Sequence, residues 1–231
     1  MVSLTANLED LTLGEAAQKL GTAVAQAGPP PRGVSVNFRG QIPALAQTIS
    51  GLRIGLLLAV LTIFLLLAAN FQSVRLAVAI LLTIPAVLCG VVLMLRLTGT
   101  TLNIQSFMGA IMAIGIAVAN SILLVTFAEH FRQEGSPLMK AAREGAGSRL
   151  RAILMTATAM TFGMVPMAIG FGEGGAQSAP LGRAVIGGLI VSTFATLTIL
   201  PSIYAILQSG ASTSSPSLNP MDPTSQYYEP V

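Results

Sequence analysis

Five apolar segments, each long enough to cross a lipid bilayer, occupy most of this chain between residues 52 and 207. We place them at residues 52–70, 76–97, 103–128, 152–170 and 184–207. A hydrocarbon core of about 30 Å is spanned by about 20 apolar residues in a helix. Only 9% of the residues are charged, against about 25% in an average soluble domain. The sequence therefore predicts an all-α polytopic membrane protein with five transmembrane helices, which moves a substrate or supports a transport machine.

Residues 1–50 have a different pattern and predict a small α+β fragment. Apolar residues alternate over residues 2–8 and 34–38, as in short strands, and residues 13–27 have the pattern of an amphipathic helix. A fragment of this size cannot bury a core alone. Because Met1 falls inside the first predicted strand, we expect the end of a larger domain in a truncated or split chain. The five-helix domain then covers residues 51–207, and residues 208–231 form a tail.

The charged loops predict the orientation of the spans. Five cations lie between the third and fourth spans: Arg132, Lys140, Arg143, Arg149 and Arg151. Arg75, in the connection between the first two spans, falls on the same side of the membrane. The positive-inside rule assigns this side to the cytoplasm. The N-terminus is then periplasmic and the C-terminus cytoplasmic.

Two further features are predicted outside the spans. The basic loop contains a pattern typical of a short surface helix from Ser136 to Glu144, with Ser136 as N-cap and Pro137 in the first turn. The tail after residue 208 is rich in Ser, Pro, Thr and Asn, a composition typical of disorder.

The third span combines small residues with polar ones near mid-membrane. Gly109, Ala113 and Ala117, together with Gly115, allow close approach of other helices. Asn120 and Ser121 need hydrogen-bond partners at this depth. Two interpretations stay open: the span is a packing helix held by an interhelical hydrogen bond, or Asn120 belongs to a polar relay inside the bundle.

The fourth span begins with two arginines. Thr156 follows Arg149 by about two turns, which places the two side chains on nearly the same helix face. Arg149 and Arg151 either anchor the span by reaching toward lipid phosphates, or Arg149 faces a water path that Thr156 extends by hydrogen bonding. Thr158 and Thr161 are expected to bond to their own helix.

Several chemistries are excluded by the sequence. Residues 170–175 match G-x-G-x-x-G but follow a membrane span rather than a strand, so we expect a turn and no nucleotide site. His130 is the only histidine, which excludes a histidine-based zinc cluster. We expect no enzyme activity, no cofactor, no metal site and no nucleic-acid partner. No Asp, Glu, Lys or His lies in the middle of a span, so a proton-driven pump would take its titrating carboxylates from elsewhere.

Several motifs, taken in order, resemble the C-terminal part of an RND (resistance–nodulation–cell division) efflux permease. They are Leu65 to Ser73, Thr83-Ile84-Pro85, Gly115 to Phe127, Arg149 to Thr156, Phe162 to Pro166, Val185 to Gly188 and Leu200-Pro201. The resemblance covers about residues 1–207. It implies that the five spans are the last five of twelve, and that residues 1–50 end the second periplasmic porter region.

The resemblance also implies partners and a site. Such permeases are proton antiporters of the bacterial inner membrane. They are homotrimers that work with a periplasmic adaptor and an outer-membrane channel. By resemblance, Thr156 and Arg149 are members of the proton relay, whose carboxylates lie in the N-terminal half. The position of the relay lysine falls on Ala119. This departure indicates a relay with fewer charges, in which Asn120 is a neutral member, or a divergent branch of the family.

The interpretation is a C-terminal fragment of a proton-driven RND-type efflux permease that exports small molecules. It requires the N-terminal half and is inactive alone. One alternative is a structural or assembly half of a split permease. Another is a protein-export or lipid-transfer member of the same scaffold. By resemblance, the substrate is recognised mainly by porter pockets that this sequence does not contain.

Overall fold

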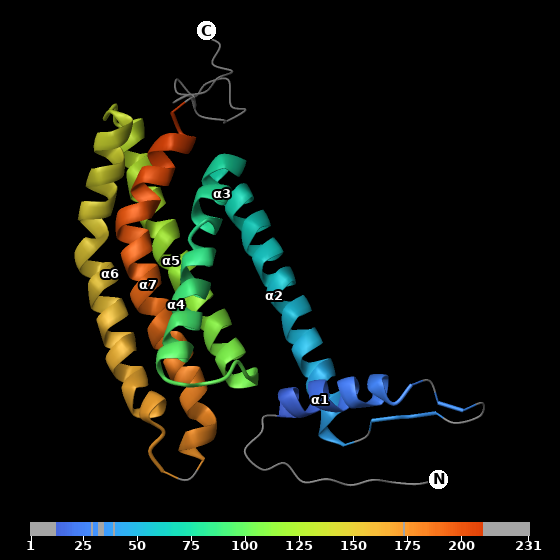
Figure 1. Ribbon diagram of the computed structural model, residues 1–231. Helices are drawn as coiled ribbons and strands as arrows, with labels where there is room; N and C mark the ends of the chain where they lie inside the picture. The colour runs from blue at the N-terminus through green and yellow to red at the C-terminus, as the bar shows by residue number, and fades with distance from the viewer. Residues whose placement is uncertain (1–12, 29, 32–34, 39, 173, 210–231) are drawn as a thin grey trace. The chain divides into compact units, whose positions relative to one another are not determined.

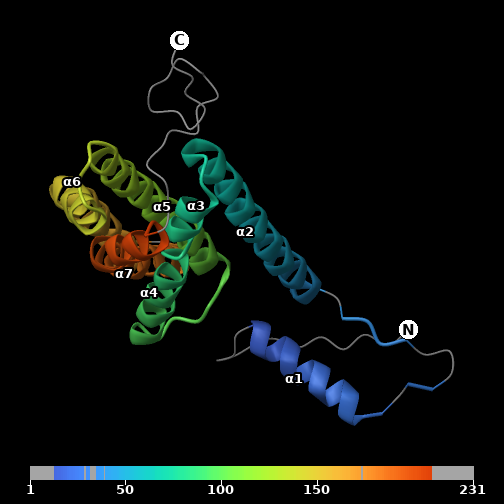
Figure 2. The same cartoon turned by 90° about the horizontal axis from the view of Figure 1, so that it is seen from above.

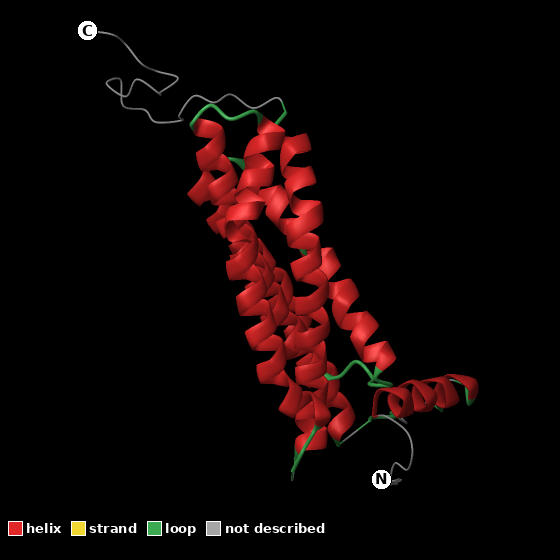
Figure 3. Ribbon diagram, turned by 90° about the vertical axis from the view of Figure 1, so that its left-hand side faces the viewer, coloured by secondary structure: helices red, strands yellow, loops and turns green. Residues whose placement is uncertain are grey.

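The structure is a computed structural model that describes residues 13–28, 30–31, 35–38, 40–172 and 174–209. These residues form seven helices and, within these ranges, no strand (Figures 1 and 3). The helices are α1 (Leu13–Gln26), α2 (Gln41–Phe71), α3 (Val74–Leu81), α4 (Ile84–Leu97), α5 (Ile104–Gln133), α6 (Leu138–Ile169) and α7 (Gly175–Leu207). Five stretches are long and apolar enough to cross a membrane, with α3 and α4 together forming one of them. The prediction of five spans is confirmed.

The chain divides into two compact units, Met1–Leu57 and Leu58–Val231. In the first unit, α1 lies close to the helix predicted at residues 13–27. The strand predicted at residues 2–8 lies outside the described residues. At the second predicted strand, residues 35–38 form no strand, and residue 34 is not described. The structure thus contains the predicted helix but does not support the predicted strands of an α+β fragment.

The second predicted span is interrupted between α3 and α4. Pro85 at the start of α4 has no N–H and its ring cannot fit against the carbonyl of residue 81 in a continuous helix. The hydroxyl of Thr83 donates a hydrogen bond of 2.7 Å to the Ile80 carbonyl, which satisfies an acceptor at the break. The interruption therefore leaves few polar groups exposed at membrane depth.

The prediction of a separate surface helix at residues 136–144 is wrong. Helix α6 begins at Leu138 with Pro137 as its N-cap and continues without a break through the fourth span to Ile169. Gly145 lies inside the helix, and a Cβ there would come within 3 Å of the backbone of Ala128 on α5. The glycine thus allows α6 to pack on α5 at a point where a break would have separated them. The glycine-rich turn after α6 has positive φ at Gly170, Gly172 and Gly174, a conformation that glycine adopts without strain.

Helix α7 is the central helix of the second unit, with α4, α5 and α6 around it (Figure 2). Its neighbours approach closely through small residues, as in other membrane helix pairs. Gly109 and Ala113 of α5 face α7, where a Cβ on Gly109 would lie 2.8 Å from Ala184 and a Cβ on Gly188 would lie 2.6 Å from Ala113. On the other side, a Cβ on Gly187 would clash with Met94 of α4. Ala117 is also buried, whereas Gly115 is exposed and has no neighbouring atom within 4 Å of a Cβ position.

This packing makes Gly187→Ala a sensitive test of the α4–α7 contact. We expect the substitution to lower the free energy of unfolding by about 1–3 kcal/mol, because the added methyl group meets Met94 and the backbone of Gly90. Unfolding of the purified chain by SDS, followed by circular dichroism, measures the loss. Gly115→Ala is the matched control and should be neutral or slightly stabilising, since alanine is the better helix former. Equal stability of the two variants would contradict the close contact.

Candidate functional site

The register of α5 against α6 is set by two contacts near their connected ends. These helices are antiparallel neighbours (Figure 1), and Gly145 of α6 packs against Ala128 of α5. One turn further on, the guanidinium carbon of Arg149 lies 4.0 Å from the centre of the Phe127 ring. The close Gly145–Ala128 contact fixes the register, and eleven residues further along the two antiparallel helices lie Thr156 on α6 and Ala117 on α5. Asn120 therefore lies about 4.5 Å, less than one helical turn, nearer the connected end than Thr156.

Arg149 is half-buried, and its charge is held by an aromatic ring rather than by a carboxylate. A cation over a phenyl face is attracted by the ring quadrupole, by about 0.5–1 kcal/mol or more where water is excluded. The Nε atom is buried and has no hydrogen-bond partner among the described residues. The guanidinium thus keeps a hydrogen-bond donor at the level where α5 and α6 meet.

Thr156 and Asn120 differ in how their polar groups are used. The Thr156 hydroxyl donates to carbonyls of its own helix, 3.1 Å from Ala152 and 3.0 Å from Ile153, while the side chain remains exposed. Asn120 is half-buried and makes no hydrogen bond within the described part of the chain. Neither contacts the other through a hydrogen bond. The structure brings the three predicted relay residues to one side of the α5–α6 pair without joining them in a network.

Ser121, next to Asn120, supplies the interhelical hydrogen bond that the sequence suggested for this part of the span. Its hydroxyl donates to the Ala117 carbonyl at 2.8 Å and lies 3.3 Å from the hydroxyl of Thr196 on α7. Both side chains are buried. Packing and hydrogen bonding are thus provided by Ser121, and Asn120 is left available for other contacts.

Ala119 lies on the side of α5 that faces away from α7. It belongs to an exposed stripe that we name the open face of α5, formed by Met108, Met112, Gly115, Ala119, Leu123 and Thr126. The spacing of three or four residues keeps this stripe on one side of the helix. A side chain at position 119 therefore projects outward from the helices of the second unit, near the middle of the 30-residue helix α5.

A polar cluster at the end where α5 and α6 connect was not predicted from the sequence. Glu129 of α5 pairs with Arg132, whose Nε lies 3.0 Å from a carboxylate oxygen. From α7, the Tyr204 hydroxyl donates to the other carboxylate oxygen at 2.7 Å, and Gln208 donates to it at 3.3 Å. Tyr204 is fully buried. The i, i+3 spacing of Glu129 and Arg132 was a local signal, but the partners from α7 are 75 or more residues away.

We call this end of the bundle the basic end, because the cations of the α5–α6 connection gather there. They are Arg132, Lys140, Arg143, Arg149 and Arg151. At the opposite end, Arg183 of α7 donates to the Ala168 carbonyl at 2.9 Å and to the Thr100 hydroxyl at 2.6 Å, and so ties α6 and the α4–α5 connection to α7. The two ends are thus fixed by polar contacts, and the centre is held by small residues.

Five apolar spans define a multi-pass membrane protein. Residues 1–208 match the model of the AcrB/AcrD/AcrF family, and the chain belongs to this family of RND permeases, which are transporters and not enzymes. The family that the sequence motifs suggested is confirmed.

The relatives and solved structures are much longer than this chain. It is 33% identical over 205 residues to the cobalt-zinc-cadmium resistance protein CzcA of Cupriavidus metallidurans, covering 89% of this chain and 19% of that protein. It is 34% identical to the solvent-resistant pump membrane transporter SrpB of Pseudomonas putida, covering 77% of this chain and 17% of the relative. A crystal structure of a heavy metal efflux pump aligns with a TM-score of 0.77 and 31% identity, over 88% of this chain and 20% of that one. The chain therefore spans about a fifth of the length of these relatives.

Proposed function

We propose that this chain forms the C-terminal membrane part of a proton-driven efflux permease that exports small molecules or ions across the bacterial inner membrane. The observation that carries the proposal is the polar seam of α5 and α6 beside the open face of α5. Asn120 is without a hydrogen bond within the described residues, Thr156 is exposed, and Arg149 keeps a buried donor. Polar groups in a membrane bundle need partners, and carboxylates from the rest of the permease would supply them.

In this proposal each residue has a distinct role. Arg149 stabilises the charged form of a nearby carboxylate through its free donor. Thr156 passes a hydrogen bond along α6, exchanging its bond to the helix backbone for one to a carboxylate or a water. Asn120 takes part as a neutral hydrogen-bonding group, since Ala119 stands where the family pattern has a lysine. The carboxylates come from another region of the same polypeptide or from a separate chain.

The assembly follows the family. The permease would be a homotrimer in the inner membrane, joined to a periplasmic adaptor and an outer-membrane channel. The basic end would face the cytoplasm by the positive-inside rule, which counts the Lys and Arg residues of short loops. The segment that precedes the first span, residues 1–50, would then lie in the periplasm. The names of CzcA and SrpB point to metal cations and solvents as the two substrate classes to test.

Expression in a pump-deficient bacterium tests the proposal directly. The chain would be produced alone and together with an N-terminal half of an RND permease, and resistance to zinc, cobalt and cadmium salts and to toluene would be measured. Efflux that appears only with the partner is the expected result. If neither condition gives efflux while both proteins reach the membrane, a truncated chain or a branch of the family with other substrates would be favoured over a split pump.

The relay role is tested in the active pair by Thr156→Ala. We expect proton-coupled efflux to fall roughly 10²-fold, the lower range for removal of a positioned proton-transfer group. Thr158→Ala is a matched control, because Thr158 also bonds to its own helix, at 2.7 Å from the Leu154 carbonyl, but lies on another face of α6. Asn120→Ala should behave like Thr156→Ala. Unchanged efflux in both Thr156→Ala and Asn120→Ala would end the relay interpretation.

A further inference from the structure

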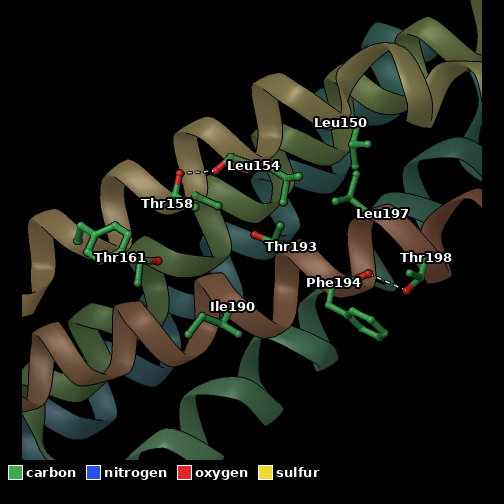
Figure 4. A pocket seen from close by; sticks show the side chains of 11 residues that line it. Leu150, Leu154, Thr158, Thr161, Ile190, Thr193, Phe194, Leu197 and Thr198 are labelled. Atoms are coloured by element: carbon green, nitrogen blue, oxygen red, sulfur yellow. Dashed lines mark hydrogen bonds between the residues drawn. The ribbon is translucent and has the colours of Figure 1, made fainter.

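A groove runs along the outer side of α6 and α7, away from the seam between α5 and α6. It has a volume of about 640 Å³ and is lined by side chains from residues 150–162 of α6 and residues 190–198 of α7 (Figure 4). Its walls are mostly apolar, with Leu150, Leu154 and Phe194 among them. Thr156 and Arg149 are not part of the lining. The groove is therefore separate from the candidate relay.

The length and depth of the groove match one leaflet of a bilayer. Residues 150 to 162 of α6 extend over about 18 Å at 1.5 Å per residue. One leaflet of a hydrocarbon core of about 30 Å is about 15 Å deep. On α6 the lining begins with Leu150, near the basic end of the bundle, and ends with Phe162. An occupant that enters from the leaflet at the basic end would thus lie along its whole length.

Arg151 lies at the end of this groove that is nearest the basic end of the bundle. Arg151 is exposed and makes no hydrogen bond or ion pair with a described residue. It precedes Thr158, which lines the groove, by two helical turns and lies on the same face of α6. An arginine at the edge of a membrane span reaches toward the interface, where phosphate groups lie.

Two hydroxyls that line the groove, those of Thr161 and Thr193, make no hydrogen bond with a described residue, so the expected bond of Thr161 to its own helix is absent. Thr158 and Thr198 each donate to their own helix, at 2.7 Å from the carbonyls of Leu154 and Phe194 (Figure 4). Thr193 lines the same groove, and its buried Oγ1 has no hydrogen-bond partner among the described residues. A purely hydrocarbon occupant would leave this donor unpaired. An occupant with an oxygen acceptor below its charged group, such as an ester carbonyl, would pair with it.

We propose that the α6–α7 groove binds an anionic phospholipid of the leaflet at the basic end. An acyl chain fills the apolar groove, the phosphate lies at Arg151, and an ester oxygen accepts a hydrogen bond from Thr193. Charge complementarity selects an anionic lipid over a neutral one, because a basic side chain near an anionic membrane surface contributes about 1 kcal/mol, or about fivefold in affinity. The site does not depend on the proposed relay.

The chain contains no tryptophan, so a single tryptophan placed in the groove reports on its occupant without background. Phe194→Trp changes an exposed groove residue, and Val92→Trp places the same reporter on an exposed part of α4. Each purified chain would be reconstituted in phosphatidylcholine vesicles that contain brominated phosphatidylglycerol or brominated phosphatidylcholine. Bromine quenches tryptophan fluorescence only at close range. We expect about fivefold stronger apparent binding of the phosphatidylglycerol at Phe194→Trp and no preference at Val92→Trp.

The charge is tested by adding Arg151→Gln to the Phe194→Trp reporter. This change should remove the preference, whereas Arg143→Gln, which removes an exposed charge elsewhere on the basic end, should keep it. Equal loss in both variants would indicate a diffuse surface potential and would overturn the site. If both brominated lipids quench the Phe194→Trp reporter far less than the Val92→Trp reporter, a protein segment covers the groove. That result would also overturn the proposed lipid site.

A second measurement needs no reporter. Native mass spectrometry of the unmodified chain, released from nanodiscs of mixed phosphatidylcholine and phosphatidylglycerol, counts the lipids that stay bound. We expect retained phosphatidylglycerol in the unmodified chain and in Arg143→Gln, and about fivefold less in Arg151→Gln. Retention that is the same in all three chains would contradict the proposal.

Discussion

Glu129→Ala is expected to lower the free energy of unfolding of the second unit by about 3–5 kcal/mol, a large effect for one side chain. The carboxylate of Glu129 binds Arg132 on α5 and accepts hydrogen bonds from Tyr204 and Gln208 on α7. Only 7% of the Arg132 side chain is exposed. Removing the carboxylate leaves this cation largely buried and leaves the Tyr204 hydroxyl without its acceptor. SDS-induced unfolding of the purified chain measures the loss.

Two further variants separate charge from packing at this cluster. Glu129→Gln keeps an acceptor for Tyr204 but removes the charge. Its free energy of unfolding should therefore lie between those of the wild type and Glu129→Ala. Glu134→Ala is the matched control, because the Glu134 carboxylate lies 3.6 Å from His130 in an exposed pair. Such a pair contributes about 0–1 kcal/mol. If Glu129→Ala and Glu134→Ala lower the free energy of unfolding by the same amount, the cluster does not join α5 to α7 in the purified protein.

The number and position of the spans could be predicted because length and apolar composition determine them locally. The interruption at Thr83 and the continuity of α6 could not be predicted in the same way. A proline near a helix start is compatible with both a break and a beginning of a span. Gly145 lowers intrinsic helix propensity, but it allows the contact with Ala128 that stabilises α6. The tertiary contact with α5 therefore keeps α6 continuous at a residue whose intrinsic propensity disfavours a helix.

The candidate site shows the same division between local and distant information. The spacing of Arg149 and Thr156 was enough to predict that they share one face of α6. The spacing of Gly109, Ala113 and Ala117 was likewise enough to predict a row of small residues on α5. Which residue of the Asn120–Ser121 pair bonds across to α7 depended on the rotation of α5, and the structure assigns that bond to Ser121. The ring that holds Arg149 and the groove between α6 and α7 arise from helices packed side by side, so no local pattern contains them.

Ala119→Lys is expected to lower the free energy of unfolding of the chain alone by about 3 kcal/mol. The side chain projects from the open face near the middle of α5, and a lysine at the centre of a span costs about 2.5–3.5 kcal/mol. In a permease that brings carboxylates to this face, the lysine gains a partner and most of the loss should be recovered. SDS-induced unfolding of the variant alone and in complex with an N-terminal half measures both values.

Leu61→Lys separates recovery by carboxylates from general protection by a partner. Leu61 is exposed on α2, so the same charge enters a different apolar span. The cost should be similar in the chain alone and should remain in the complex. Recovery of both variants would mean that the partner only shields lysines from lipid, and recovery of neither would mean that no carboxylate reaches position 119. Recovery of Ala119→Lys alone would locate the carboxylates of the proposed pump beside Asn120, on the open face of α5.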